Sequence, residues 1–61
     1  MANLTTKELT ALEEQLGFEK ILISKYSAFA EQSTDPQIKS RCQSVAARHL
    51  EHYKMLQRHL G

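Results

Sequence analysis

The segment STDP at positions 33–36 decides the fold, because it is the break between two long stretches of helix-forming residues. Asp35 followed by Pro36 is typical of a helix start. The carboxylate accepts hydrogen bonds from the first free backbone N–H groups, and proline at the first helical position loses no hydrogen bond. Near the other end of the chain, Thr5-x-x-Glu8 has the pattern of a capping box, which marks the start of another helix.

These signals predict a first helix over about residues 6–32, a turn over 33–35 and a second helix over about 36–60. Gly61 fits as the C-terminal cap of the second helix. Two helices of this length joined by so short a turn fold back on each other. We therefore predict an all-α chain, an antiparallel two-helix hairpin in which residues 1–61 form a single domain.

Composition excludes most other classes of protein. A chain of 61 residues is too short for a cofactor-binding fold or a barrel, and two Gly with one Pro are too few for a turn-rich β protein. A net charge of +1 argues against nucleic acid or a membrane surface as partner. Cys42 has no companion for an internal disulfide, and neither a membrane span nor a secretory signal is visible. We expect an intracellular, cytoplasmic protein.

Spacings of three and four residues select one stripe on each predicted helix, and the two stripes match in antiparallel order. The expected pairs are Ala30 with Ile38, Tyr26 with Cys42, Ile23 with Val45, Glu19 with His49, Leu16 with His52, and Leu12 with Leu56; Leu9 and His59 extend the stripes. Residues 1–32 carry five acids and three bases, whereas residues 33–61 carry two acids and five bases, so charge also favours the pairing.

The apolar surface is wider than this seam. Large apolar residues flank it on both helices, namely Leu22, Phe29, Tyr53, Met55 and Leu60, and Phe18 and Ile21 lie further round the first helix. A lone hairpin would leave much of this surface in water, and exposed apolar patches usually mark an interface. We expect a homodimer in which two hairpins form a four-helix bundle, with Phe18, Leu22, Phe29, Tyr53, Met55 and Leu60 at the interface.

Three polar residues, Glu19, His49 and His52, lie at seam positions and at one level of the hairpin. Two imidazoles and a carboxylate are ligands that suit zinc, copper, iron or manganese. In a dimer the set would be doubled near the centre of the bundle. Polar residues in a helical seam also serve to fix register through a hydrogen bond, as Glu19 and His49 could do. Both interpretations, a divalent transition metal site and a hydrogen-bonded core without any cofactor, stay open.

No catalytic set accompanies this cluster. The sequence has no Ser-His-Asp pattern, no Gly-rich phosphate loop and no Cys pair, and Cys42 alone is typical of a small buried apolar group. Gly17 costs about 1 kcal/mol relative to Ala in a helix, so it predicts a kink or the close approach of another helix. We expect a non-enzymatic protein.

Three stretches resemble a known family: FEKILISKYSAFA at 18–30, DPQIKSRC at 35–42, and ARHLEHYKMLQRHL at 47–60. Together they are similar to the spore coat F group of small ferritin-like proteins from spore-forming bacteria. The resemblance implies a ferritin-like hairpin that dimerises, other spore coat proteins as partners, and a spore-associated location as the alternative to a cytoplasmic one.

The wider ferritin-like group also implies metal ligands, namely a Glu on the first helix and Glu-x-x-His on the second. By this resemblance Glu19 matches the first carboxylate and His52 the histidine of the motif, whereas His49 stands where the motif has Glu. We therefore expect a small helical assembly protein of the spore coat, with a ferritin-like protein that binds metal in the dimer core as the alternative.

Overall fold

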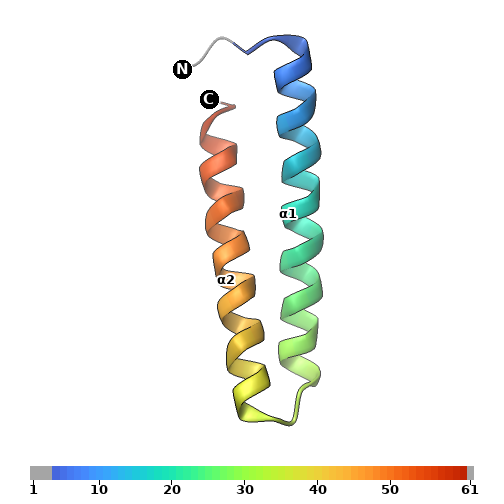
Figure 1. The fold of residues 1–61 in the computed structure, drawn as a ribbon, viewed down its shortest axis with the longest axis vertical. Coiled ribbons are helices and arrows are strands. Elements are labelled where there is room, and N and C mark those ends of the chain that lie inside the picture. Colours follow the sequence, from blue (N-terminus) through green and yellow to red (C-terminus); the bar gives the residue numbers. More distant parts are fainter. Residues whose placement is uncertain (1–3, 61) are drawn as a thin grey trace.

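A computed structural model describes residues 4–60 as two helices, α1 (Thr6–Gln32) and α2 (Pro36–Arg58), with no strand among those residues. The helices pack against each other in antiparallel order, so the start of α1 and the end of α2 lie at the same end of the molecule (Figure 1). The hairpin measures 46 × 16 × 11 Å. The prediction of an all-α hairpin is confirmed.

Both helix starts have the caps that the sequence predicts. Thr5 Oγ1 accepts a hydrogen bond from the Glu8 N–H at 3.1 Å, and Glu8 Oε1 accepts one from the Thr5 N–H at 3.0 Å. Asp35 Oδ1 accepts from the N–H groups of Gln37 and Ile38 at 2.8 and 3.3 Å. Each cap satisfies backbone donors that have no partner within the helix, so these two positions fix where the helices begin.

The end of α2 differs slightly from the prediction, because the helix stops at Arg58 instead of about residue 60. His59 donates its N–H to the carbonyl of Leu56 at 3.0 Å, and Leu60 donates to Gln57 at 3.1 Å. These bonds span three residues rather than four, so the last turn tightens and the α-helix ends there. Gly61, the predicted cap, lies outside the described residues.

The predicted seam is the contact line between the helices in its central part. Leu12, Leu16, Ile23, Tyr26, Cys42, Val45 and Leu56 are all at least half-buried. The ends of the stripes differ from the prediction: Leu9, Ile38 and His59 are exposed. Within residues 4–60 each helix has one neighbouring helix, and a large side chain near the end of a helix pair extends beyond that neighbour. Ala46, which the stripe omitted, is buried instead.

The hairpin hides very little apolar volume. Among residues 4–60 only Glu19, Ala30 and Ala46 are buried, and no large side chain is fully enclosed. Two alanines and one carboxylate do not make a hydrophobic core of the size that usually stabilises a domain. The two helices therefore define the shape of the chain but leave several of its larger apolar side chains exposed, among them Phe18, Ile21 and Phe29.

Candidate functional site

The candidate site centres on Glu19, which is 5% exposed although it is charged. It lies in the middle of α1, on the stripe that faces α2. Gln15, one turn earlier on the same helix, donates its Nε2–H to Glu19 Oε2 at 3.0 Å. A side chain four residues away on a helix lies directly above its partner, so the spacing itself brings the amide to the carboxylate. One carboxylate oxygen is thereby held, and Oε1 is turned toward α2.

Two histidines of α2 face this second oxygen. His49 Nδ1 lies 2.6 Å from Glu19 Oε1, and His52 Nδ1 lies 3.8 Å from the same atom. The predicted pairing of Glu19 with His49 is confirmed. His52, expected opposite Leu16, also turns its ring nitrogen toward Glu19. The sequence placed all three groups at one level, and the structure converges them on a single oxygen.

Ring packing fixes the two imidazoles. The rings of His49 and His52 meet edge to face with centroids 5.6 Å apart, and the Tyr26 ring stacks on His49 at 6.4 Å with an angle of 14° between the planes. Tyr26 in turn contacts Phe29 edge to face at 6.0 Å. A continuous series of aromatic rings therefore runs from Phe29 on the flank to the centre of the cluster. Neither this series of rings nor the role of Gln15 is among the features predicted from the residue pattern.

The hydrogen bond from His49 holds the pKa of the Glu19 carboxyl below its usual range. Burial opposes this by raising the pKa, while the Gln15 hydrogen bond and the charges of both histidines lower it further. The net effect favours the ionised carboxylate. The cluster thus keeps an anion in the seam that is hydrogen-bonded on both oxygens.

Within the described residues, Glu19, His49 and His52 form the one group of three or more potential metal ligands. One donor atom from each lies within 4.8 Å of the other two. Their burial differs, with the His49 side chain 22% exposed and that of His52 45% exposed. The arrangement can act as a hydrogen-bonded polar core, and it can also offer two nitrogens and one oxygen to a divalent transition metal.

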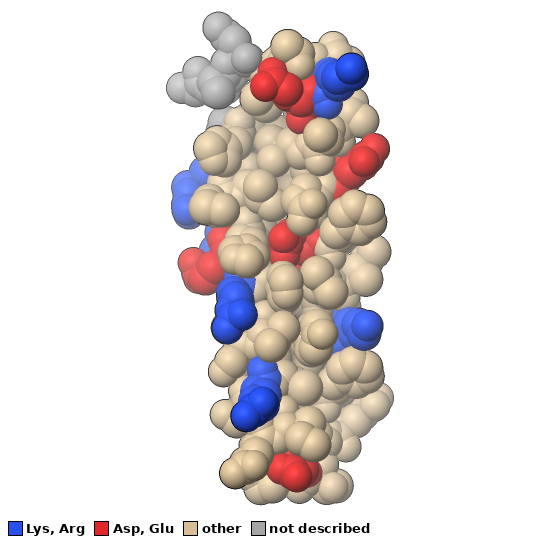
Figure 2. All heavy atoms as spheres, in the orientation of Figure 1, with Lys and Arg blue, Asp and Glu red and all other residues tan. Residues whose placement is uncertain are grey.

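The side chains predicted at a dimer interface are largely on the surface of the hairpin. Phe18, Phe29, Met55 and Leu60 are exposed, Phe18 by 57%, while Leu22 and Tyr53 are half-buried. Ile21, further round α1, is exposed by 63%. Figure 2 shows that most of one face of the molecule is uncharged and that its Lys and Arg side chains are separated from one another.

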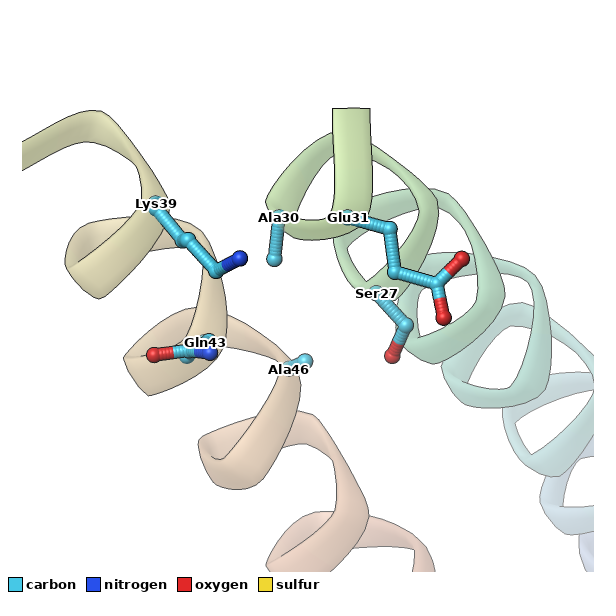
Figure 3. Close-up of a pocket in the computed structure, with 6 residues that line it drawn as sticks. All are labelled: Ser27, Ala30, Glu31, Lys39, Gln43 and Ala46. Atoms are coloured by element: carbon cyan, nitrogen blue, oxygen red, sulfur yellow. The ribbon is translucent and has the colours of Figure 1, made fainter. Parts of the chain in front are cut away.

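Near the turn, a shallow cavity of about 310 Å³ lies between the helices. Its lining comes from both helices: Ser27, Ala30, Glu31, Lys39, Gln43 and Ala46. Figure 3 shows Ala30 and Ala46 facing the space between the helices, with the Lys39 side chain extending from α2 toward Ala30. The short side chains of Ala30 and Ala46 leave space between the helices here, and the other four lining residues are polar or charged.

Cys42 is a half-buried free thiol, in agreement with its position in the seam.

Neither described helix is both long enough and apolar enough to cross a membrane. Comparisons of the chain with protein-family models, with curated proteins and with solved structures found no match. The resemblance to the spore coat F group therefore stays a prediction.

Proposed function

We propose that this protein is a non-enzymatic helical assembly module, in which two hairpins associate into a four-helix bundle. The observation that carries the proposal is the absence of any fully enclosed large side chain among residues 4–60. Burying one Phe, Leu, Ile or Met side chain stabilises a protein by about 1.5–3 kcal/mol, and the hairpin forgoes this at several positions. A second copy supplies the same apolar flank and can cover the first.

The exposed area supports association. Compact monomers of 7.0 kDa have an accessible surface of about 4,000 Å² by the usual scaling with mass. The hairpin has 4884 Å². The excess is close to the roughly 800 Å² that each partner loses in an interface of standard size. An extended shape of 46 × 16 × 11 Å causes this excess, and pairing along the long axis removes it.

The position of the apolar residues suggests which surface pairs. Phe18, Leu22 and Phe29 follow one another at spacings of four and seven residues, so they form one stripe along α1. The Phe29 ring contacts the Tyr26 ring, and the Tyr26 ring stacks on His49 of the polar cluster. Pairing through this stripe would bury the flank of the cluster as well. The resemblance to the spore coat F group supports the spore coat as the setting, with other coat proteins as partners.

Sedimentation equilibrium tests the assembly. At micromolar concentration we expect about twice the chain mass of 7.0 kDa. The double variant Phe18→Glu, Phe29→Glu places charges on the stripe and should sediment as a single chain or unfold. Ala28→Glu is the matched control, because Ala28 is exposed and lies beside Phe29 but outside the stripe. A parent chain that is monomeric, folded and cooperative would contradict the four-helix bundle.

A separate test addresses the setting. A fluorescent fusion of the chain, expressed in a sporulating bacterium, should collect at the spore periphery and should lose this position in the Phe18→Glu, Phe29→Glu variant. A uniform cytoplasmic signal throughout sporulation would refute the coat assignment while leaving the dimer untouched.

The second candidate function is metal binding, and the observation that favours it is the convergence of Glu19, His49 and His52. The resemblance to ferritin-like proteins supports a metal site in the core of the dimer. Equilibrium dialysis of the untagged chain against Zn²⁺, Mn²⁺ and Fe²⁺ tests it, and dialysed protein without bound metal would exclude this function.

A further inference from the structure

We infer that each hairpin is by itself a complete three-ligand site for one zinc-type divalent ion, formed by Glu19 Oε1 and the Nδ1 atoms of His49 and His52, with a remaining coordination position open. The inference rests on the second candidate function, metal binding, and deepens it: the site is mononuclear and lies within one chain. It does not require a carboxylate or imidazole from a partner.

The donor atoms already stand close to the required geometry. Nitrogen and oxygen ligands bind zinc at about 2.0–2.2 Å, which places tetrahedral ligand atoms roughly 3.4 Å apart. Around Glu19 Oε1 the present separations are 2.6 Å to His49 and 3.8 Å to His52. One separation must widen and one must shorten, each by less than about 1 Å. One donor atom from each of the three residues lies within 4.8 Å of the other two, so we expect side-chain rotations to bring them to bonding distance.

Gln15 acts as a positioning residue for this site. Its amide holds Glu19 Oε2 at 3.0 Å and thereby presents Oε1 alone to the histidines. Groups that hydrogen-bond a metal ligand orient it, and their removal typically weakens metal affinity about 10–100-fold. The stacking of Tyr26 on His49 and the edge-to-face contact of His49 with His52 restrain the rings in the same way.

Metal binding displaces a proton from Nδ1 of His49 and needs no reactant other than the ion. Metal coordination needs a lone pair on each Nδ1, whereas the hydrogen bond between His49 and the ionised carboxylate uses a proton on that nitrogen. Binding therefore moves this proton to Nε2 of the same ring or releases it to solvent.

Because His49 supplies an imidazole and not a second carboxylate, the cluster favours one ion per hairpin over a pair of ions. A dinuclear centre needs carboxylates that bridge two metals, and the described residues bring one carboxylate to the cluster. Glu51, the other acidic residue close in sequence, lies on the exposed side of α2 with its carboxylate near Lys54. A set of two imidazoles and one carboxylate matches mononuclear zinc sites that keep an open position. The partly exposed His52 ring gives the ion access from solvent.

Titration of the untagged chain with Co²⁺ and Zn²⁺ tests the inference. We expect one ion per chain and an affinity that is independent of chain concentration across the range in which sedimentation shows dimers dissociating. His52→Gln should weaken binding by at least about tenfold, and Gln15→Ala by about 10–100-fold. His59→Gln is the matched control, since His59 is an exposed histidine outside the cluster, and it should leave the affinity unchanged.

Nuclear magnetic resonance of the histidine rings supplies a readout that does not depend on affinity. Zn²⁺ should shift the Nδ1 resonances of His49 and His52 and leave those of His59 in place. Circular dichroism confirms that each variant keeps its helix content. Where a histidine variant unfolds, Glu19→Gln is used instead: it keeps the size of the side chain, removes its charge and replaces one acceptor oxygen by an N–H donor, and it should weaken metal binding.

The outcomes separate the inference from the function on which it depends. One ion for two chains, or affinity that rises with chain concentration, overturns the single-chain site and leaves metal binding standing in the dimer. Equal loss in the His52→Gln and His59→Gln variants also overturns it, because the ion then binds adventitiously to surface histidines. Titrations without binding remove metal binding altogether, and the sedimentation result decides the assembly proposal independently.

Discussion

The hairpin has two buried regions that solve the same packing problem differently. Near the turn, Ala30 and Ala46 are buried because a methyl group is short enough to fit between the two helices. In the middle of the seam a carboxylate is buried instead, and Glu19 is tolerated there because both of its oxygens are hydrogen-bonded. In these two regions the pair of helices encloses side chains that are very small or hydrogen-bonded on every polar atom, and several larger apolar side chains stay exposed.

The largest expected effect comes from separating the members of the polar cluster. In metal-free protein, the double variant His49→Leu, His52→Leu leaves the Glu19 carboxylate without its imidazoles and should lower the free energy of unfolding by about 1–3 kcal/mol. The triple variant with Glu19→Leu added removes the whole cluster and should be neutral or more stable than the parent by about 1–4 kcal/mol. Urea unfolding at one fixed chain concentration measures both.

If the double variant were more stable than the triple variant, the explanation given for the burial of Glu19 would be wrong. A double variant as stable as the parent would mean that the carboxylate reaches water without its histidines. A triple variant that is strongly destabilised would mean that the cluster supplies stability rather than register or a binding site.

The next effect concerns the alanine region. Ala46→Leu inserts a large side chain where the helices are close, and overpacking of this kind should lower the free energy of unfolding by about 1–3 kcal/mol. Ala47→Leu is the matched control. Ala47, the next residue, is exposed, so this substitution should change the free energy of unfolding by no more than about 0.5 kcal/mol. Thermal unfolding followed by circular dichroism compares the two. Equal stability of both variants would show that the cavity beside Ala46 accepts the extra carbon atoms.

Substitution of Gly17 tests whether a second copy packs closely against the middle of α1 in the proposed dimer. A Cβ placed on Gly17 meets nothing within 4 Å in the hairpin. The expected close approach of another helix is therefore not made by α2. Gly17→Ala should raise the free energy of unfolding by about 0.8–1 kcal/mol through helix propensity alone. A loss of stability together with weaker dimerisation in sedimentation would show that the second copy approaches at this residue.

The smallest expected effect is the contribution of Glu19 to the pH dependence of stability. Its pKa is lowered in the folded chain, chiefly by the His49 hydrogen bond. The stabilisation is present above the unfolded value of about 4.3 and is lost as the pH falls through the lower folded pKa. Glu19→Gln should therefore reduce the loss of stability on acidification. Urea midpoints measured between neutral and acid pH, with chelator present, determine the difference.

Two other carboxylates of α1, Glu8 and Glu13, help to interpret this pH dependence. The pKa of Glu8 is also lowered, by the backbone hydrogen bond from Thr5, so a residual acid dependence should persist in the Glu19→Gln protein. Glu13→Gln changes an exposed carboxylate of the same helix and is the control. A Glu19→Gln profile parallel to that of the parent would place the acid sensitivity outside the cluster.

Local signals along the chain are sufficient to predict the helices, their caps and the level of the polar cluster. Capping at Thr5 and Asp35 depends on neighbours two or three residues away, and the stripe containing Glu19 and His49 follows from the helical period. Both are local physics, so the chain order of the residues is sufficient to predict them. An antiparallel turn then fixes the register, because residues equally distant from it meet.

Which side chains the seam encloses depends on how the two helices pack in space. The separation of the helices selects Ala46 for burial and leaves Leu9 and Ile38 exposed at the ends. Side-chain rotations turn the His52 ring toward the carboxylate, and they decide that Gln15 meets one carboxylate oxygen while His49 meets the other. Interhelical distance and rotamer choice depend on all neighbours in space at once, and a residue pattern along one chain does not contain them.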